Sequence, residues 1–134
     1  MKTAGDILIV DDERDIRSLI AATLRDEGFA TMEAASASEA RDLMAAKPPG
    51  LAILDIWMRD SDMDGLELLE WVQGIYPELP VVMISGHGTV ETAVQAIRNG
   101  AYDFIEKPFK EDRLLLMVQR ALESTRLMRE NAEL

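Results

Sequence analysis

Three aspartates, a serine and a lysine are the residues of this chain best placed to do chemistry together. Asp11 and Asp12 follow the apolar run 6–10, Asp55 ends the run 51–55, Ser85 follows the run 81–84, and Lys107 follows the run 102–105. If these runs are parallel strands of one sheet, all five side chains meet at the edge where the strands end. Three carboxylates within several ångströms of one another repel by roughly 3 kcal/mol per pair at an effective dielectric of about 20. The cluster therefore needs a counter-charge.

Lys107 and a divalent cation are the counter-charges that the sequence suggests. The chain has no cysteine and a single histidine, His87, so thiolate and histidine-rich metal centres are excluded. Any metal then binds oxygen, and Mg²⁺ suits a site with few carboxylates and an anionic substrate. A carboxylate, a hard cation and a lysine together indicate phosphoryl transfer onto an aspartate oxygen.

Alternating strand and helix patterns indicate the elements that position these residues. Strands are expected at 6–10, 30–34, 51–55, 81–84 and 102–105. Helices are expected at 13–27, from Ser36 or Ser38 to 46, at 66–75, at 89–99, and from 111 far toward the end. Five such repeats predict an α/β domain with a parallel sheet, because each right-handed crossover covers one face of the sheet.

Length, charge and hydropathy set limits on the whole chain. At 134 residues and 48% hydrophobic content it forms one domain. A net charge of −11 argues against direct contact with nucleic acid or an anionic membrane. No apolar run approaches the roughly 20 residues of a membrane span, and the start does not read as a signal peptide, so we expect a cytoplasmic location.

Five motifs in this order give the chain a family resemblance. They are Ile9-Val10-Asp11-Asp12-Glu13, Leu54-Asp55-Ile56-Trp57-Met58, Asp64-Gly65-Leu66-Glu67-Leu68, Ile84-Ser85-Gly86 and Lys107-Pro108-Phe109. Over about residues 6–122 the chain resembles response-regulator receiver domains, and it looks most like the NtrX type within the NtrC group. The resemblance implies a flavodoxin-like fold, with strand order 2-1-3-4-5 and helices on both faces of the sheet.

The resemblance also implies a role for each site residue. Asp55 would be the phosphoacceptor. Asp12 and Asp55 would bind Mg²⁺ directly, Asp11 would help through water, and the backbone carbonyl of Trp57 would complete the protein ligands. Ser85 and Lys107 would contact the phosphoryl oxygens, Phe104 would be the switch aromatic, and the Lys107–Pro108 bond would be cis.

The function implied by the resemblance is a signalling switch, which catalyses only its own phosphorylation and dephosphorylation. A sensor histidine kinase would donate the phosphoryl group. A homodimer would form through the fourth helix, fifth strand and fifth helix. Residues 1–122 would form the receiver domain, and 123–134 a helical linker toward an output region, a sigma54-type AAA+ transcriptional activator with a DNA-binding domain.

One segment departs from the family pattern. Arg59 stands where the family usually has proline, and the loop before Asp64 is about two residues longer. We expect the segment 59–63 to be more mobile than usual and to alter access to Asp55.

Two other function classes remain as alternatives. A haloacid-dehalogenase-like phosphatase also forms an aspartyl phosphate, but it needs a second aspartate two residues after the nucleophile, where this chain has Trp57. A flavodoxin-like module for a phosphorylated cofactor has fold analogy as its only support, and without a metal the acidic pocket repels phosphate. For Trp57 and Trp71, packing is the default expectation.

Overall fold

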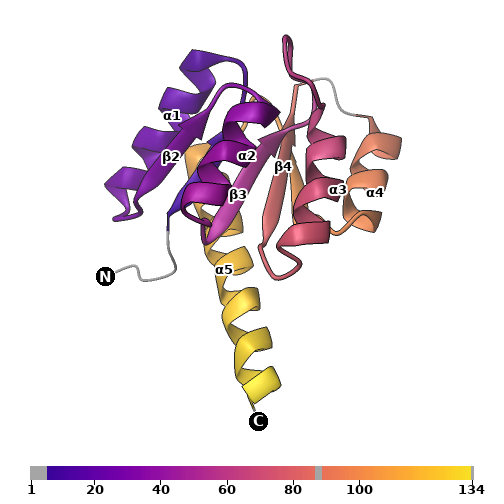
Figure 1. Cartoon of the computed structure of the whole chain (residues 1–134). Helices are drawn as coiled ribbons and strands as arrows, with labels where there is room; N and C mark the ends of the chain where they lie inside the picture. The colour runs from indigo at the N-terminus through magenta and orange to yellow at the C-terminus, as the bar shows by residue number, and fades with distance from the viewer. Residues whose placement is uncertain (1–5, 87–88, 134) are drawn as a thin grey trace.

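A five-stranded parallel sheet forms the centre of the molecule (Figure 1). The computed structural model describes residues 6–86 and 89–133. The strands are β1 (Ile7–Val10), β2 (Thr31–Ala34), β3 (Leu51–Asp55), β4 (Val81–Ser85) and β5 (Asp103–Glu106). Their order in space is β2-β1-β3-β4-β5, which confirms the predicted fold class.

Helices cover both faces of this sheet. The helices are α1 (Arg14–Asp26), α2 (Ala37–Ala46), α3 (Gly65–Ile75), α4 (Val90–Arg98) and α5 (Glu111–Glu133). Successive strand residues point to opposite faces, so Leu8 and Leu54 pack with α2, α3 and α4, while Ile9 and Ile53 pack with α1 and α5. Strands β1, β3 and β4 are buried on both faces and read as nearly continuous apolar runs, which is why the sequence located them closely, whereas the edge strands β2 and β5 are partly exposed.

Side-chain caps fix where three of the helices begin. Ser36 accepts a hydrogen bond from the amide of Glu39 and so starts α2, and Thr89 starts α4 in the same way. Asp64 and Glu67 form a reciprocal capping box at the start of α3. These caps lie at the edge where the strands end, so the helix starts and the predicted site residues share one end of the molecule.

On α1 the buried residues are Ile20, Ala21, Thr23 and Leu24, while Leu19 is 45% exposed. One expectation about a single side chain is wrong. Trp57 was expected to pack, but it is 48% exposed because it follows the sheet edge. Trp71 does pack, against the core and edge-on to Tyr76.

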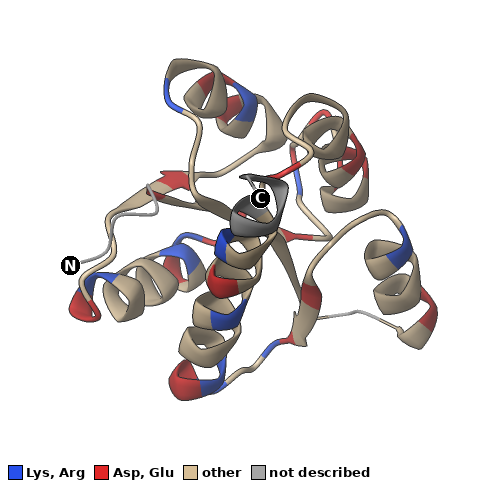
Figure 2. Cartoon of the chain, turned by 90° about the horizontal axis from the view of Figure 1, so that it is seen from below, with Lys and Arg blue, Asp and Glu red and all other residues tan. Residues whose placement is uncertain are grey.

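Helix α5 runs well past the far edge of the sheet (Figure 1). Seen along its axis, acidic and basic residues both occur along it (Figure 2). None of the described helices is long and apolar enough to cross a membrane.

Candidate functional site

The strand ends bring three carboxylates together. Asp11 and Asp55 are 0% and 3% exposed, and Asp12 is half-buried. Strand register explains the proximity, because Val10 pairs with both Ala34 and Leu54 and so places the residues after β1 beside the end of β3. One oxygen from each of the three carboxylates lies within 4.8 Å of the others. This spacing suits a hard cation that binds oxygen, such as Mg²⁺.

Lys107 supplies the positive charge that the sequence predicted at this edge. Its Nζ lies 2.8 Å from Asp11 Oδ2, 3.5 Å from Asp55 Oδ2 and 3.5 Å from Glu13 Oε1. The backbone places it there, since the amide of Lys107 donates to the carbonyl of Ser85 at 2.9 Å. The Lys107–Pro108 bond is cis, as the resemblance implied.

Burial changes the acidity of these groups. Burial, and after it the charge of Asp11, raises the pKa of Asp55 to about 7. Burial also raises the pKa of Asp11, although Lys107 and the amide of Glu13 oppose the shift. For Lys107, burial disfavours the charge, but Asp11 and Asp55 outweigh it and raise its pKa. Without a metal, these shifts favour a charged Lys107 and a partly protonated Asp55 near neutral pH.

Two residues that sequence reasoning missed support the β1–α1 turn. Arg17 Nη1 donates to the backbone carbonyl of Asp11 at 2.8 Å, and its Nε lies 3.5 Å from Glu33 Oε1 on β2. Glu13 is the exposed third partner of Lys107. Glu13 lies within the quoted motif, so its position could have drawn attention to it. Nothing in the sequence predicted the contacts of Arg17 beyond its position one turn into a helix.

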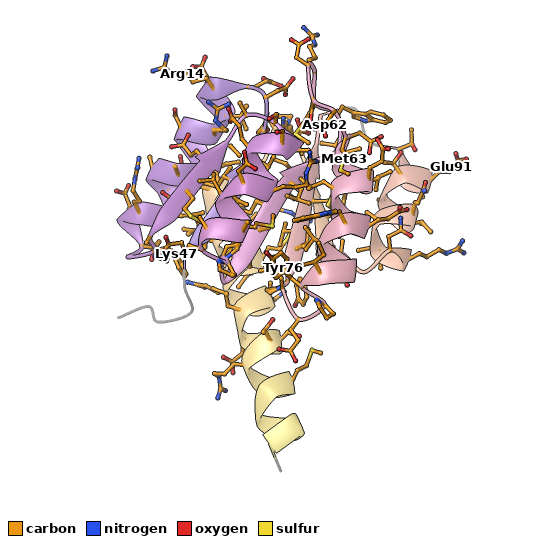
Figure 3. The ribbon with its side chains drawn as sticks, in the orientation of Figure 1. Arg14, Lys47, Asp62, Met63, Tyr76 and Glu91 are labelled. Carbon is orange, nitrogen blue, oxygen red and sulfur yellow. The ribbon has the colours of Figure 1, made fainter. Side chains whose placement is uncertain are left out.

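The loop between β3 and α3, which contains the segment expected to be mobile, makes several contacts outside the site. The hydroxyl of Ser61 accepts from the amide of Ala37 at 2.9 Å and donates to the carbonyl of Met63 at 2.7 Å. Asp62 forms an ion pair with Arg41 of α2 at 2.6 Å. Asp62 and Met63 are seen close to α2 in Figure 3, at the end opposite Lys47. The added residues therefore form contacts with a neighbouring helix.

A groove lies beside Asp12, the least buried of the three carboxylates. It has a volume of about 930 Å³, and its lining includes Asp12, Glu13, Trp57, Arg59 and Asp60. It opens between the segments that follow β1, β2 and β3.

The remaining predicted residues lie around the same edge. Ser85 is fully buried at the end of β4, next to Lys107 through the backbone. Phe104 on β5 is partly buried against the α2–α4 side of the core. His87 lies outside the described residues.

Comparisons with known proteins agree with this geometry. The response regulator receiver domain model matches residues 7–119. The nitrogen assimilation regulatory protein NtrX of Azorhizobium caulinodans is 57% identical over 131 residues, which are 98% of this chain and 29% of that protein. The chain therefore spans less than a third of that relative's length.

Solved structures show the same similarity. The crystal structure of the receiver domain of NtrX from Brucella abortus has a TM-score of 0.86 and 59% identity, covering 88% of this chain and 98% of that one. The solution structure of the beryllofluoride-activated NtrC4 receiver domain dimer has a TM-score of 0.84 and 38% identity, covering 90% of this chain and 98% of that one. The chain belongs to the response regulator receiver domain family, and its similarity is to the NtrX and NtrC types.

Proposed function

We propose that Asp55 accepts a phosphoryl group in a Mg²⁺-dependent reaction. The observation that carries this proposal is the position of Asp55, buried at the end of β3 with two carboxylates and Lys107 around it. An oxygen of Asp55 attacks phosphorus, the bond between phosphorus and the donor breaks, and an acyl phosphate forms. The chain itself supplies position and charge.

The surrounding residues have separate roles in this proposal. Asp12, Asp55 and the carbonyl of Trp57 would hold Mg²⁺, and Asp11 would help through water. When bound, the ion would supply positive charge for the carboxylates and for the phosphoryl oxygens. Lys107 and the Ser85 hydroxyl bind the oxygens of the transferred group. Lys107 is already 3.5 Å from Asp55, which supports its assignment.

We further propose that phosphorylation switches the receiver between two states that an output region reads. The donor is a sensor histidine kinase, and Phe104 turns inward as Ser85 moves toward the phosphoryl group. Residues 1–122 form the receiver, and 123–134 a helical linker to an output region that regulates transcription, through a sigma54-type AAA+ activator with its own DNA-binding domain. A cytoplasmic location fits this role.

The phosphoacceptor assignment can be tested by mass. After incubation with acetyl phosphate and Mg²⁺, we expect the wild-type chain to gain one phosphoryl group, labile to base. Asp55→Asn removes the nucleophilic oxygen and should abolish this gain of mass, whereas Asp42→Asn on the exposed surface of α2 should still gain one phosphoryl group. Intact-mass spectrometry of the wild type and the two variants measures these outcomes. A phosphoryl group on Asp55→Asn assigns the role to another residue, and steady release of phosphate identifies a phosphatase.

A further inference from the structure

The backbone amide of residue 59 contacts a proposed metal ligand. The amide of Arg59 donates a hydrogen bond to Asp12 Oδ2 at 2.8 Å. Asp12 nonetheless offers an oxygen that lies within 4.8 Å of oxygens of Asp11 and Asp55. A carboxylate has two oxygens and several acceptor positions, so an amide can fix its orientation while a cation takes the rest. This amide is therefore placed to orient Asp12.

Only a residue other than proline can make this contact. Proline has no amide N–H, and proline is the residue that the resemblance leads one to expect at this position. Arg59 has the backbone N–H that a proline would lack. The departure from the family pattern that the sequence shows at residue 59 thus has a direct chemical consequence at Asp12.

The segment that carries this amide is held from outside the site. We call Arg59–Asp64 the strap. Ser61 binds the buried first residue of α2, Ala37, and Asp62 binds Arg41 one turn further along the same helix. At its end Asp64 caps α3. Between the amide and these anchors the chain turns sharply at Asp60, whose φ of 54° is the only positive value among the described non-glycine residues.

We propose that the strap holds the Arg59 amide against Asp12 and so sets the affinity of the site for Mg²⁺. The Arg59 amide, Ser61 and Asp62 act through Asp12 and are positioning groups. The consequence is that α2, which touches none of the carboxylates through its own side chains in the described contacts, contributes to metal binding through the strap. This inference rests on the proposed Mg²⁺ site.

The central experiment compares Arg59→Pro with Arg59→Ala. Both variants lose the guanidinium, but only proline loses the amide N–H. We expect Arg59→Pro to bind Mg²⁺ about tenfold more weakly than Arg59→Ala, since a hydrogen bond to a charged group typically has that effect. The dissociation constants come from NMR shift titrations, with circular dichroism as a check that each variant is folded.

A second experiment leaves the amide in place and releases the strap. Ser61→Ala combined with Asp62→Asn removes both anchors on α2. We expect faster hydrogen exchange at the Arg59 amide and Mg²⁺ binding several-fold weaker than in wild type. Lys47→Gln is the matched control. It breaks the 3.2 Å ion pair with Asp6 at the other end of α2 and leaves both readouts unchanged. A purely structural role would lower the melting temperature without moving the Arg59 exchange rate.

A spectroscopic measurement tests the contact itself. Asp12→Asn exchanges a charged acceptor for a neutral one, so the Arg59 amide proton should shift upfield, while the amide of Asp112 on α5 stays in place. Equal Mg²⁺ affinities for Arg59→Pro and Arg59→Ala would overturn the proposal. If Arg59→Pro does not fold, unchanged Mg²⁺ binding in the strap-release variant overturns it instead. No Mg²⁺ binding by the wild-type chain would refute the metal site, and the strap proposal with it.

Discussion

As the proposed phosphoacceptor, Asp55 would have to be an anion to attack phosphorus, yet its surroundings favour the neutral acid. The residue is 3% exposed, and burial together with Asp11 raises its pKa to about 7. Lys107 only partly neutralises the charge of Asp55, because its closest contact is Asp11 and not Asp55. A divalent cation would complete the neutralisation and would shift Asp55 toward the reactive form. The burial of Asp55 is thus the physical reason to expect the proposed reaction to depend on a metal.

The raised pKa of Asp55 predicts how stability depends on pH in the absence of metal. A carboxyl with a folded pKa near 7 and an unfolded value near 3.8 binds more protons when folded, so between these values stability falls as pH rises. Asp55→Asn removes the carboxylate and so removes this loss of stability at high pH. We expect it to raise the free energy of unfolding by on the order of 1–3 kcal/mol at pH 8. The gain should shrink as pH is lowered through 7 toward 4.

Urea denaturation in EDTA across this pH range measures the effect. Asp42→Asn, which removes an exposed carboxylate of α2, serves as the control. A constant effect of Asp55→Asn from pH 5 to pH 8 would show that Asp55 titrates normally.

At the scale of elements, the close contact between β3 and α3 is what places Asp55. Gly65 begins α3, and its amide donates to the carbonyl of Ile56 at 2.8 Å. A Cβ atom at Gly65 would lie 2.1 Å from the Asp55 carbonyl oxygen and 2.6 Å from Ile56 Cα, both backbone atoms that cannot turn aside. The helix start and the strand end can approach this closely only with glycine.

Two glycine-to-alanine changes in α3 should therefore have opposite signs. Gly65→Ala forces β3 and α3 apart, and we expect it to lower the free energy of unfolding by about 2–4 kcal/mol. Gly74→Ala meets nothing within 4 Å and should raise it by about 0.5–1 kcal/mol through better helix propensity. Thermal and urea unfolding of both variants measures this. Equal changes in the free energy of unfolding for the two variants would mean that β3 and α3 can move apart without loss of stability.

The same elements show what a sequence can predict. Strands buried on both faces give unbroken apolar runs, so β1, β3 and β4 were located closely and brought Asp11, Asp55 and Ser85 to one edge. The Arg59 contact to Asp12 could not be predicted, because a backbone amide is present at nearly every residue and its direction depends on loop conformation. The ion pair between Asp62 and Arg41 could not be predicted either. The two residues are 21 positions apart, and neither residue's type specifies its partner.

For the molecule as a whole, the acidic cluster should make the folded state a better cation binder than the unfolded chain. Folding brings the three carboxylates within 4.8 Å, whereas unfolding separates them. Mg²⁺ at about ten times its dissociation constant should therefore stabilise the fold by about 1.4 kcal/mol. Differential scanning calorimetry with MgCl₂ measures the shift, and NaCl at equal ionic strength is the control. A melting temperature that responds equally to both salts contradicts a specific site.

The surface formed by α4, β5 and α5 is where we expect phosphorylation to change how two copies associate. Val90, Val94 and Ile97 on α4 are 81%, 44% and 45% exposed, and Tyr102 before β5 and Leu116 on α5 are also exposed. So many large apolar side chains over neighbouring elements suit a surface that another protein covers. The similar NtrC4 receiver was solved as a beryllofluoride-activated dimer. Strand β5, which carries Phe104, pairs with β4, which ends in Ser85, so these two strands lie between this surface and the site.

We expect beryllofluoride with Mg²⁺ to lower the dimer dissociation constant by about tenfold or more, a typical coupling between two sites. Val94→Asp should abolish dimerisation by placing a charge on the exposed apolar face of α4. Leu19→Asp makes the same change at a residue of similar exposure, on α1 across the sheet, and should leave the dimer intact. Analytical ultracentrifugation with and without beryllofluoride distinguishes these outcomes. Monomers in both conditions at high micromolar concentration would exclude a dimer switch in this chain, and its signal would then have to pass through contacts with an output region.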